Sequence, residues 1–195
     1  MNFDFDAPYD DADPWGFRSR WFESRRRELV LACLPRQRFA HALELGCANG
    51  EMTASLAGRA DALLALDASA RAIALARQRV TAPHVRLAQA ELPREWPAGR
   101  FDLIVLSEIG YYLSPADLRA TADAMCAALA PDGVVLAAHW RHPFEGKTAT
   151  QEQVHATLHE RLALERLGGY LDADLCIDVL AADTRSIATR EGLAP

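Results

Sequence analysis

Carboxylates and glycines recur in this sequence where short apolar runs end. Glu44 and Gly46 close the run HALELG, Asp67 closes ALLALD, and Glu108 closes FDLIVLSE. Glycine allows close backbone approach to a ligand and positive φ angles. A carboxylate about 20 residues after such a glycine can accept hydrogen bonds from both ribose hydroxyls. The pattern predicts a nucleotide-type ligand held between the first two runs.

Three further groups of polar or aromatic residues follow later apolar runs. Ala90, Glu91 and Leu92 end or follow HVRLAQA, and Glu91 is placed to reach an adenine amino group. The remaining candidates follow the fourth and fifth runs, and they are Ser107, Glu108, Tyr111, Tyr112, His139, Trp140, Arg141 and His142.

The elements that position these residues alternate between strand and helix patterns. Strands are predicted at 41–46, 62–67, 84–90, 101–108 and 133–140, helices at 15–34, 50–58, 114–129 and 151–162, and one more helix ending before Pro83. A turn is expected at 131–133, and the runs 162–172 and 173–183 form a hairpin. This order predicts an α/β fold: a Rossmann-like, doubly wound, mostly parallel sheet with a C-terminal antiparallel hairpin. Such sheets bind ligands beyond the carboxyl ends of their strands.

Charge and composition divide the 195 residues into three parts. Residues 1–13 carry five Asp and are expected to form a flexible arm, 14–182 a single domain, and 183–195 a flexible tail. Outside the arm, 22 acidic residues nearly balance 21 Lys and Arg, which argues against nucleic acid as a partner. No apolar run has membrane length and no signal peptide is recognised, so a cytoplasmic monomer or homodimer is expected.

Neither the cysteines nor the histidines show the spacing of a metal site. The four cysteines form no CxxC pair, and His155 and His159 lie in HATLHE, which lacks the glutamate of HExxH. No metal is expected.

The glycine loop favours S-adenosylmethionine over NAD as the ligand. Aligned from Gly46, the dinucleotide fingerprint GxGxxG would place glycines where Ala48 and Glu51 stand. A loop beside the Glu44 carboxylate is also a poor binding site for a negatively charged pyrophosphate. S-adenosylmethionine carries no phosphate and needs carboxylates for its ribose and ammonium groups, which Glu44, Asp67 and Glu91 can supply.

The segments LELGCANG, LALD, FDLIVLSEIGYYL and LAPDG resemble the motifs of class I S-adenosylmethionine-dependent methyltransferases. More narrowly, the chain resembles the nodulation protein S (NodS) family of N-methyltransferases. This resemblance rests on Asp13-Pro14-Trp15 before an Arg-rich helix, on Glu44-Leu45-Gly46-Cys47, and on the stretch from Ser107 to Leu113. It implies N-methylation of a small amino compound such as an amino sugar or saccharide. An O-methyltransferase and a non-catalytic cofactor-binding partner protein are the alternatives.

The predicted cofactor-binding residues gather at the strand ends and on the first helix. They are Trp15, Arg26, Glu44, Gly46, Cys47, Gly50, Asp67, Ala68, Ala90, Glu91, Leu92, Ser107 and Tyr112. Arg26 is expected to pair with the methionyl carboxylate in a helix that covers the pocket. Alternatively, Trp15 and the three adjacent arginines only cover the core or form a solvated face, and Glu91 faces solvent.

The predicted catalytic residues are Glu108, His139 and Tyr111. A carboxylate at the end of a buried strand is costly unless it has a task, so Glu108 is the first candidate for orienting or deprotonating an amine, with His139 as the competing base. Tyr111 and Tyr112 either pack or wall the acceptor site near the sulfonium. Trp140 and His142 are expected to bind the substrate.

Overall fold

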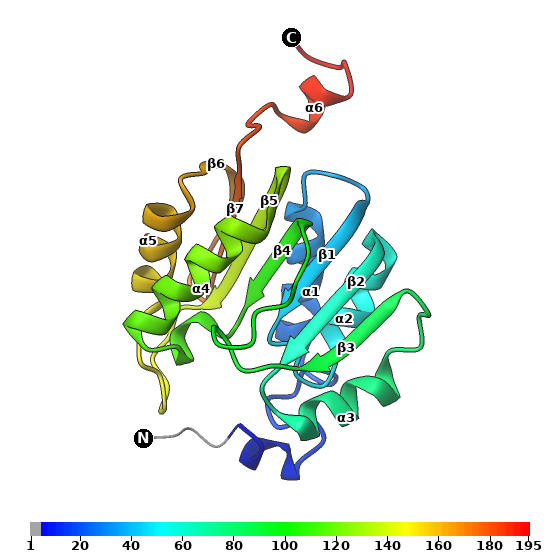
Figure 1. Ribbon diagram of the computed structural model, residues 1–195, viewed down its shortest axis with the longest axis vertical. Helices are drawn as coiled ribbons and strands as arrows, with labels where there is room; N and C mark the ends of the chain where they lie inside the picture. The colour runs from blue at the N-terminus through cyan, green and yellow to red at the C-terminus, as the bar shows by residue number, and fades with distance from the viewer. Residues whose placement is uncertain (1–4) are drawn as a thin grey trace.

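A seven-stranded sheet forms the centre of the computed structural model, which describes residues 5–195 (Figure 1). The strand order is β3-β2-β1-β4-β5-β7-β6. The strands are β1 (Phe39–Leu45), β2 (Ala60–Asp67), β3 (Val85–Gln89), β4 (Phe101–Ser107), β5 (Leu129–Trp140), β6 (Glu165–Leu171) and β7 (Leu175–Ala181). The strands β1 to β5 run parallel, whereas β7 is antiparallel to both β5 and β6. The predicted fold class is confirmed.

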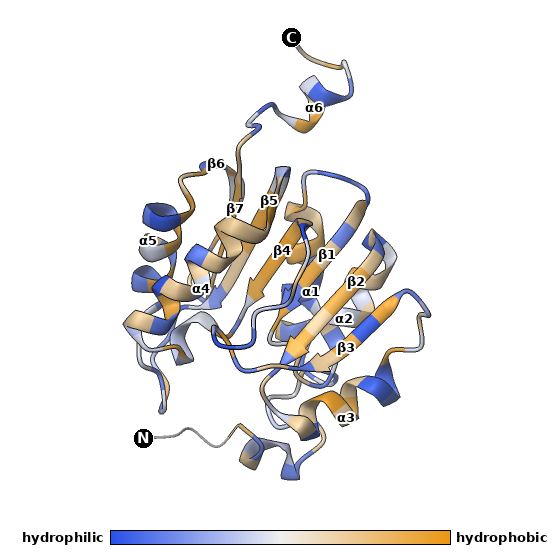
Figure 2. Ribbon diagram, viewed as in Figure 1, coloured by the Kyte–Doolittle hydropathy of each residue, from blue (hydrophilic) through white to orange (hydrophobic). Residues whose placement is uncertain are grey.

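Helices cover the sheet on both faces. They are α1 (Trp21–Cys33), α2 (Glu51–Leu56), α3 (Ala70–Arg79), α4 (Pro115–Ala128) and α5 (Gln151–Leu162). The short helix α6 (Ile187–Arg190) lies apart from the sheet, and the 3-10 turns are η1 (Ala7–Asp10), η2 (Ala57–Arg59) and η3 (Gly110–Tyr112). Alternate residues of β4 face opposite layers, so Ile104 packs with α4 and α5 while Leu103 packs with α1 and α2. Figure 2 shows the apolar strands between these layers.

Two element boundaries differ from the sequence-based expectation. The first helix begins at Trp21 rather than at residue 15, because Gly16 turns the chain at a φ of +74° and Asp13 accepts the Arg18 N–H at 3.1 Å. The turn expected at 131–133 belongs to β5 instead, which starts at Leu129 and is bulged where it pairs with the start of β4.

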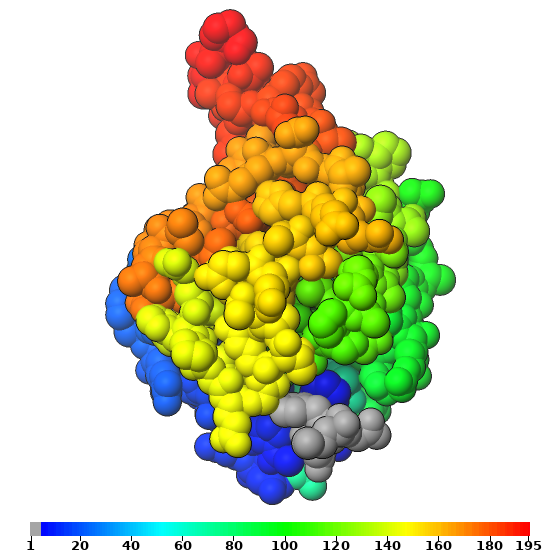
Figure 3. Space-filling model, turned by 90° about the vertical axis from the view of Figure 1, so that its left-hand side faces the viewer, coloured from blue at the N-terminus to red at the C-terminus, as the bar shows by residue number. Residues whose placement is uncertain are grey.

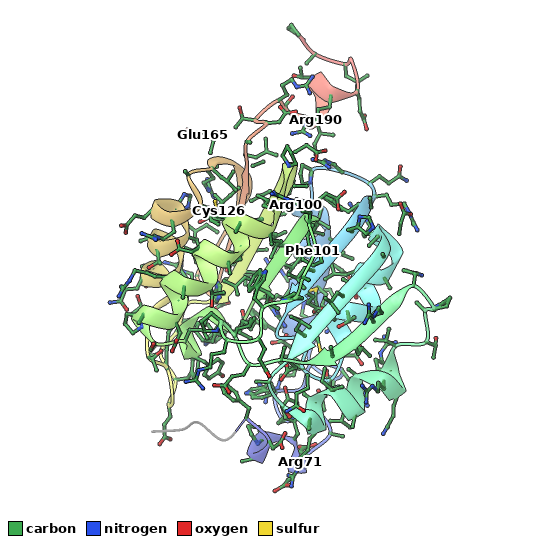
Figure 4. The ribbon with its side chains drawn as sticks, in the orientation of Figure 1. Arg71, Arg100, Phe101, Cys126, Glu165 and Arg190 are labelled. Carbon is green, nitrogen blue, oxygen red and sulfur yellow. The ribbon has the colours of Figure 1, made fainter. Side chains whose placement is uncertain are left out.

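The N-terminal segment contacts the domain. The Asp6 carboxylate accepts a hydrogen bond from the Ser69 hydroxyl at 2.5 Å, and Asn49 donates to the Ala12 carbonyl at 3.2 Å. Asp10 forms an ion pair with Arg71, which Figure 4 shows beside this segment. Residues 5–13 of the predicted arm therefore have defined partners, and residues 1–4 lie outside the described residues.

The C-terminal segment extends from β7 away from the sheet and contains α6 (Figure 1). Its helix is capped locally, since the Ser186 hydroxyl accepts the Thr189 N–H at 3.0 Å. None of the helices in residues 5–195 is both long and apolar enough to span a bilayer.

Candidate active site

Three neighbouring strands bring the predicted residues to one edge of the sheet. Glu44 of β1 is in register with Ala65 of β2 and with Val105 of β4. These strands end within two residues of that register, at Leu45, Asp67 and Ser107, and the loops that follow them carry further polar side chains. This is the carboxyl edge at which parallel sheets bind ligands.

The loop after β1 is built around left-handed backbone conformations. Gly46 has a φ of +78°, and a Cβ added there would lie 2.2 Å from Cγ2 of Ile109, so only glycine fits. Its N–H and that of Cys47 both donate to the Leu66 carbonyl at 2.8 Å. Ala48, where the dinucleotide fingerprint would have its second glycine, keeps a φ of +49°. Gly50, with a φ of +84°, immediately precedes α2.

The Asp67 carboxylate fastens this loop to the end of β2. Its Oδ2 accepts the Ala48 N–H at 2.8 Å and its Oδ1 accepts the Ser69 N–H at 2.9 Å. Burial raises the pKa of Asp67. Because each carboxylate oxygen has a second lone pair, both oxygens can still accept a hydrogen bond from a hydroxyl group. The geometry fits the predicted ribose contact.

Glu44 is buried with one oxygen unsatisfied. Glu44 is 1% exposed, and its Oε2 has no hydrogen-bond partner among the described residues. Burial raises the pKa of this carboxyl group to about 8. An unpaired buried acceptor is costly, and a ligand ammonium would supply the missing donor. Glu44 therefore fits the ammonium group of S-adenosylmethionine.

Binding of S-adenosylhomocysteine near pH 7 should release protons, because burial raises the pKa of the free Glu44 carboxyl to about 8 and the ligand ammonium requires its ionised form. Affinity should consequently rise with pH up to about 8. Calorimetry in two buffers with different ionisation enthalpies measures this release. Glu44→Gln should abolish it, and an unchanged release in that variant would assign the proton to another group.

Arg26 extends from α1 into the same edge. It is 5% exposed, and its Nη1 donates to the Ser107 hydroxyl at 2.8 Å while Nε and Nη2 donate to Glu23 at 2.9 and 2.7 Å. Its neighbour Arg25 pairs with Asp172 at 3.1 Å, and Arg27 donates to the Phe17 carbonyl at 2.5 Å. The three adjacent arginines therefore have protein partners, and Arg26 lies at the site.

Glu108 is held in place through both carboxylate oxygens. Oε1 accepts the Trp140 N–H at 2.9 Å, and Oε2 accepts the Tyr111 hydroxyl in a short hydrogen bond. Burial raises the pKa of Glu108, and the positive charge of Arg26 lowers it in part. Its φ of +63° is rare for a residue with a side chain, and such conformations concentrate at functional sites.

His139 occupies a different place from the one predicted for a base. It alternates with Val135 and Ala137 along β5, so its side chain enters the fully buried layer under α5. There its Nε2 accepts the Gly110 N–H at 3.2 Å, and its Nδ1 lies 3.1 Å from His155 Nε2. Both ring nitrogens are thus engaged within the protein, and His139 has no lone pair for a substrate proton.

Aromatic rings gather beside Glu108. The Trp140 ring lies 4.9 Å from the Phe22 ring and 4.6 Å from the His142 ring. His142 is in turn hydrogen-bonded to Asp174 at 2.7 Å. The two predicted substrate residues are therefore adjacent, and Phe22 of α1 joins them without having been predicted.

The residues after β3 are less closely grouped than expected. The Ala90 N–H donates to the Asp67 carbonyl at 2.9 Å, which places this segment beside Asp67, the predicted ribose ligand. The Gln89 side chain donates to the Ala68 carbonyl at 2.9 Å in the same region. The Glu91 side chain, however, is exposed and forms an ion pair with Arg94 at 3.2 Å. Leu92 packs against the core.

Tyr9, like Phe22, was not predicted from the sequence to lie at the site. Burial raises its pKa, with Asp67, Cys47 and Tyr112 as further contributors, so it lies among the predicted cofactor residues. Its ring packs edge-on against Trp15 at 5.4 Å. The Tyr112 ring lies 5.2 Å from that of Tyr111. The acidic composition around Tyr9 hid this contact, since it suggested an unstructured arm.

Comparisons with known proteins identify the family. Residues 5–177 match the family model described as Nodulation protein S (NodS). The chain belongs to the NodS family. Nodulation protein S of Sinorhizobium fredii is 34% identical over 167 residues, which cover 80% of this chain and 75% of the relative.

Two solved structures extend the comparison to three dimensions. The N-methyltransferase NodS from Bradyrhizobium japonicum, in complex with S-adenosyl-L-homocysteine, is 28% identical with a TM-score of 0.78, covering 90% of this chain and 94% of that one. A protein from Pseudomonas syringae described as a putative methyltransferase is 48% identical with a TM-score of 0.74, covering 83% and 99%. This NodS-family chain is an S-adenosylmethionine-dependent methyltransferase, as predicted.

Proposed function

We propose that this protein transfers a methyl group to the nitrogen of a small amino compound, an amino sugar or saccharide being the favoured class. The single observation that carries the proposal is the partly buried Glu108 carboxylate at the carboxyl edge of β4, oriented by Tyr111 and the Trp140 N–H. The similarity to the NodS N-methyltransferase supports transfer to nitrogen.

The residues proposed to hold S-adenosylmethionine surround the loop after β1. Asp67 accepts hydrogen bonds from the ribose hydroxyls, Glu44 accepts one from the ammonium group, and Arg26 forms an ion pair with the methionyl carboxylate. When bound, the cofactor supplies a methyl group activated on a positively charged sulfur. Tyr9, Trp15 and Tyr112 exclude water from this side of the pocket, and the Gly46–Gly50 loop brings its backbone close to the ligand.

Glu108 prepares the acceptor. An amine is protonated near neutral pH and must lose a proton before its lone pair can attack, so a nearby carboxylate with a raised pKa assists as base. The Tyr111 hydroxyl donates to Glu108 Oε2, and that bond fixes the direction of the carboxylate. Most of the rate comes from positioning the amine, because methyl transfer needs little covalent help.

The aromatic group formed by Phe22, Trp140 and His142 is proposed to contact the acceptor. Aromatic faces cover the apolar faces of sugar rings, while the His142 and Asp174 pair offers hydrogen bonds to hydroxyls. Under this proposal the acceptor is a small molecule rather than a nucleic acid, and the enzyme acts in the cytoplasm as a monomer or homodimer.

Matched acceptors test the nitrogen proposal. Glucosamine oligosaccharides should stimulate formation of S-adenosylhomocysteine, and their fully N-acetylated counterparts should not, because acetylation removes the basic lone pair and leaves every hydroxyl. Mass spectrometry should locate the added methyl on nitrogen. Equal turnover of both forms would instead establish O-methylation, and cofactor binding without turnover of any acceptor would favour a non-catalytic binding protein.

A further inference from the structure

A chain of buried hydrogen bonds lies behind the candidate base, between β5, β7 and α5. It starts at the Gly110 N–H, which donates to His139 Nε2 at 3.2 Å. His139 Nδ1 lies 3.1 Å from His155 Nε2, and His155 Nδ1 lies 2.7 Å from Asp178 Oδ2. His139, His155 and Asp178 are all buried. Figure 3 shows α5 and the β6–β7 hairpin side by side on the face that covers this chain of hydrogen bonds.

The direction of every bond in this chain follows from its first member. A backbone N–H can only donate, so His139 Nε2 carries no proton and His139 Nδ1 must carry one. His139 Nδ1 then donates to His155 Nε2, which leaves the proton of His155 on Nδ1, where it donates to Asp178. All three links are satisfied with both imidazoles neutral and the carboxylate ionised.

The same argument counts against a metal at these residues. His155, Cys176 and Asp178 have ligand atoms within 4.8 Å of one another, which resembles a metal site. A metal would need a lone pair on His155 Nδ1, where the chain requires a proton. Asp178 is also occupied, because its Oδ1 accepts from Arg166 Nε at 2.6 Å and its Oδ2 accepts from His159 at 3.1 Å.

The surroundings of Asp178 favour its ionised form and those of His139 favour its neutral form, as the chain of hydrogen bonds requires. Although burial raises the pKa of Asp178, hydrogen bonds from His155, Arg166 and His159 hold it well below its usual value. Burial lowers the pKa of His139 well below its usual value, and the neighbouring His155, Lys147 and Arg26 lower it further.

The inner end of the chain supports the turn that carries Tyr111. Gly110 begins the 3-10 turn η3, and a Cβ added to Gly110 would lie 2.9 Å from His139 Nε2, so the turn and the imidazole are in close contact. The Tyr111 ring packs edge-on against the His139 ring at 5.2 Å, and its hydroxyl donates to Glu108. A displaced imidazole would therefore shift Tyr111 and, through it, the Glu108 carboxylate.

We propose that His155 and Asp178 are positioning residues for methyl transfer, acting through the Nδ1–H tautomer of His139 to fix the Gly110–Tyr112 turn and the Tyr111–Glu108 pair. Both residues are buried, and their proposed effect passes through His139. The inference rests on the proposed function only in its consequence for turnover, because the hydrogen-bond chain and the order of the turn are measurable without an acceptor.

Two substitutions of His155 divide the chain at different points. In His155→Gln the amide oxygen can take the place of Nε2 and accept from His139, while the link to Asp178 is lost. In His155→Asn the shorter side chain can reach Asp178 but leaves His139 Nδ1–H without an acceptor. His41→Gln is the matched control, because His41 is exposed near the start of β1.

Nuclear magnetic resonance of the histidine nitrogens tests the chain in the full-length protein. We expect the Nδ1–H tautomer for His139 and His155, and slow amide exchange at Gly110. His155→Asn should speed that exchange at least about tenfold, His155→Gln should restore most of the protection, and His41→Gln should change nothing. An Nε2–H tautomer at His139, equal protection in both His155 variants, or stoichiometric zinc in the purified protein would each overturn the proposal.

Turnover tests the consequence for positioning. With a glucosamine oligosaccharide as acceptor, His155→Asn should lower kcat about 10- to 100-fold and leave S-adenosylhomocysteine affinity within about twofold, as expected for a misplaced reacting group. Asp178→Asn should show a smaller loss, and His155→Gln should recover most of the rate. Unchanged kcat in His155→Asn would overturn the positioning role. No turnover by the wild type, with the histidine tautomers as expected, would count against the proposed function alone.

Discussion

Glu108→Gln is expected to keep cofactor affinity and to lose turnover by about 10²- to 10⁴-fold, the range of a missing general base. Glutamine preserves the shape of the side chain, and its amide oxygen can still accept the Trp140 N–H. It cannot take a proton from an ammonium acceptor or orient it by charge. Steady-state kinetics with an amine acceptor, together with calorimetric titration of S-adenosylhomocysteine, separates the two effects.

Glu160→Gln is the matched control for this substitution, since Glu160 is exposed on α5. Normal turnover by Glu108→Gln would mean that the acceptor arrives deprotonated or loses its proton to water. Loss of cofactor affinity with normal turnover at saturation would move Glu108 from the acceptor side of the site to the cofactor side.

Asp67→Ala should weaken S-adenosylmethionine binding by about 1.5–3 kcal/mol, the scale of a lost hydrogen bond to a charged group. This corresponds to roughly 10- to 150-fold in Kd. Two causes contribute, because Asp67 is proposed to bind the ribose and also accepts the Ala48 and Ser69 N–H groups. Isothermal titration calorimetry on the folded variant gives the change directly.

Asp67→Asn divides these two causes. Its amide oxygen keeps one backbone hydrogen bond and loses the negative charge, so an affinity between those of wild type and Asp67→Ala is expected. Asp61→Ala is the control, since Asp61 lies near the other end of β2 and is largely exposed. Unchanged affinity in a folded Asp67→Ala variant would overturn the ribose assignment.

The sequence was sufficient to predict the sheet and the edge of the sheet that carries the site. Apolar runs of strand length alternate with helical patterns, and in a parallel sheet that order places every strand end on the same side. Glu44, Asp67 and Glu108 can therefore be grouped from the sequence alone. The helix starts near Ser114 and at Gln151 could also be predicted from the sequence, because helix capping depends only on neighbouring residues.

Contacts between segments distant in the chain could not be predicted in this way. The placement of Tyr9 among the cofactor residues depends on how an acidic segment docks onto the loops after β1 and β2, and composition alone suggested a free arm. The partners of Arg26 likewise depend on the packing angle of α1, which hydrophobic periodicity does not specify.

His139 shows most clearly what the sequence by itself determined and what only the tertiary structure decided. Its position after an apolar run placed it correctly at the end of β5, since strand patterns are local. Its function depended on which face of the strand it occupies and on what lies there. The alternation along β5 directs it into the layer under α5, where the Gly110 N–H and His155 occupy both ring nitrogens. Hydrogen-bond partners come from residues brought together by packing, so the burial of His139 and the engagement of both its ring nitrogens could be seen only in the folded structure.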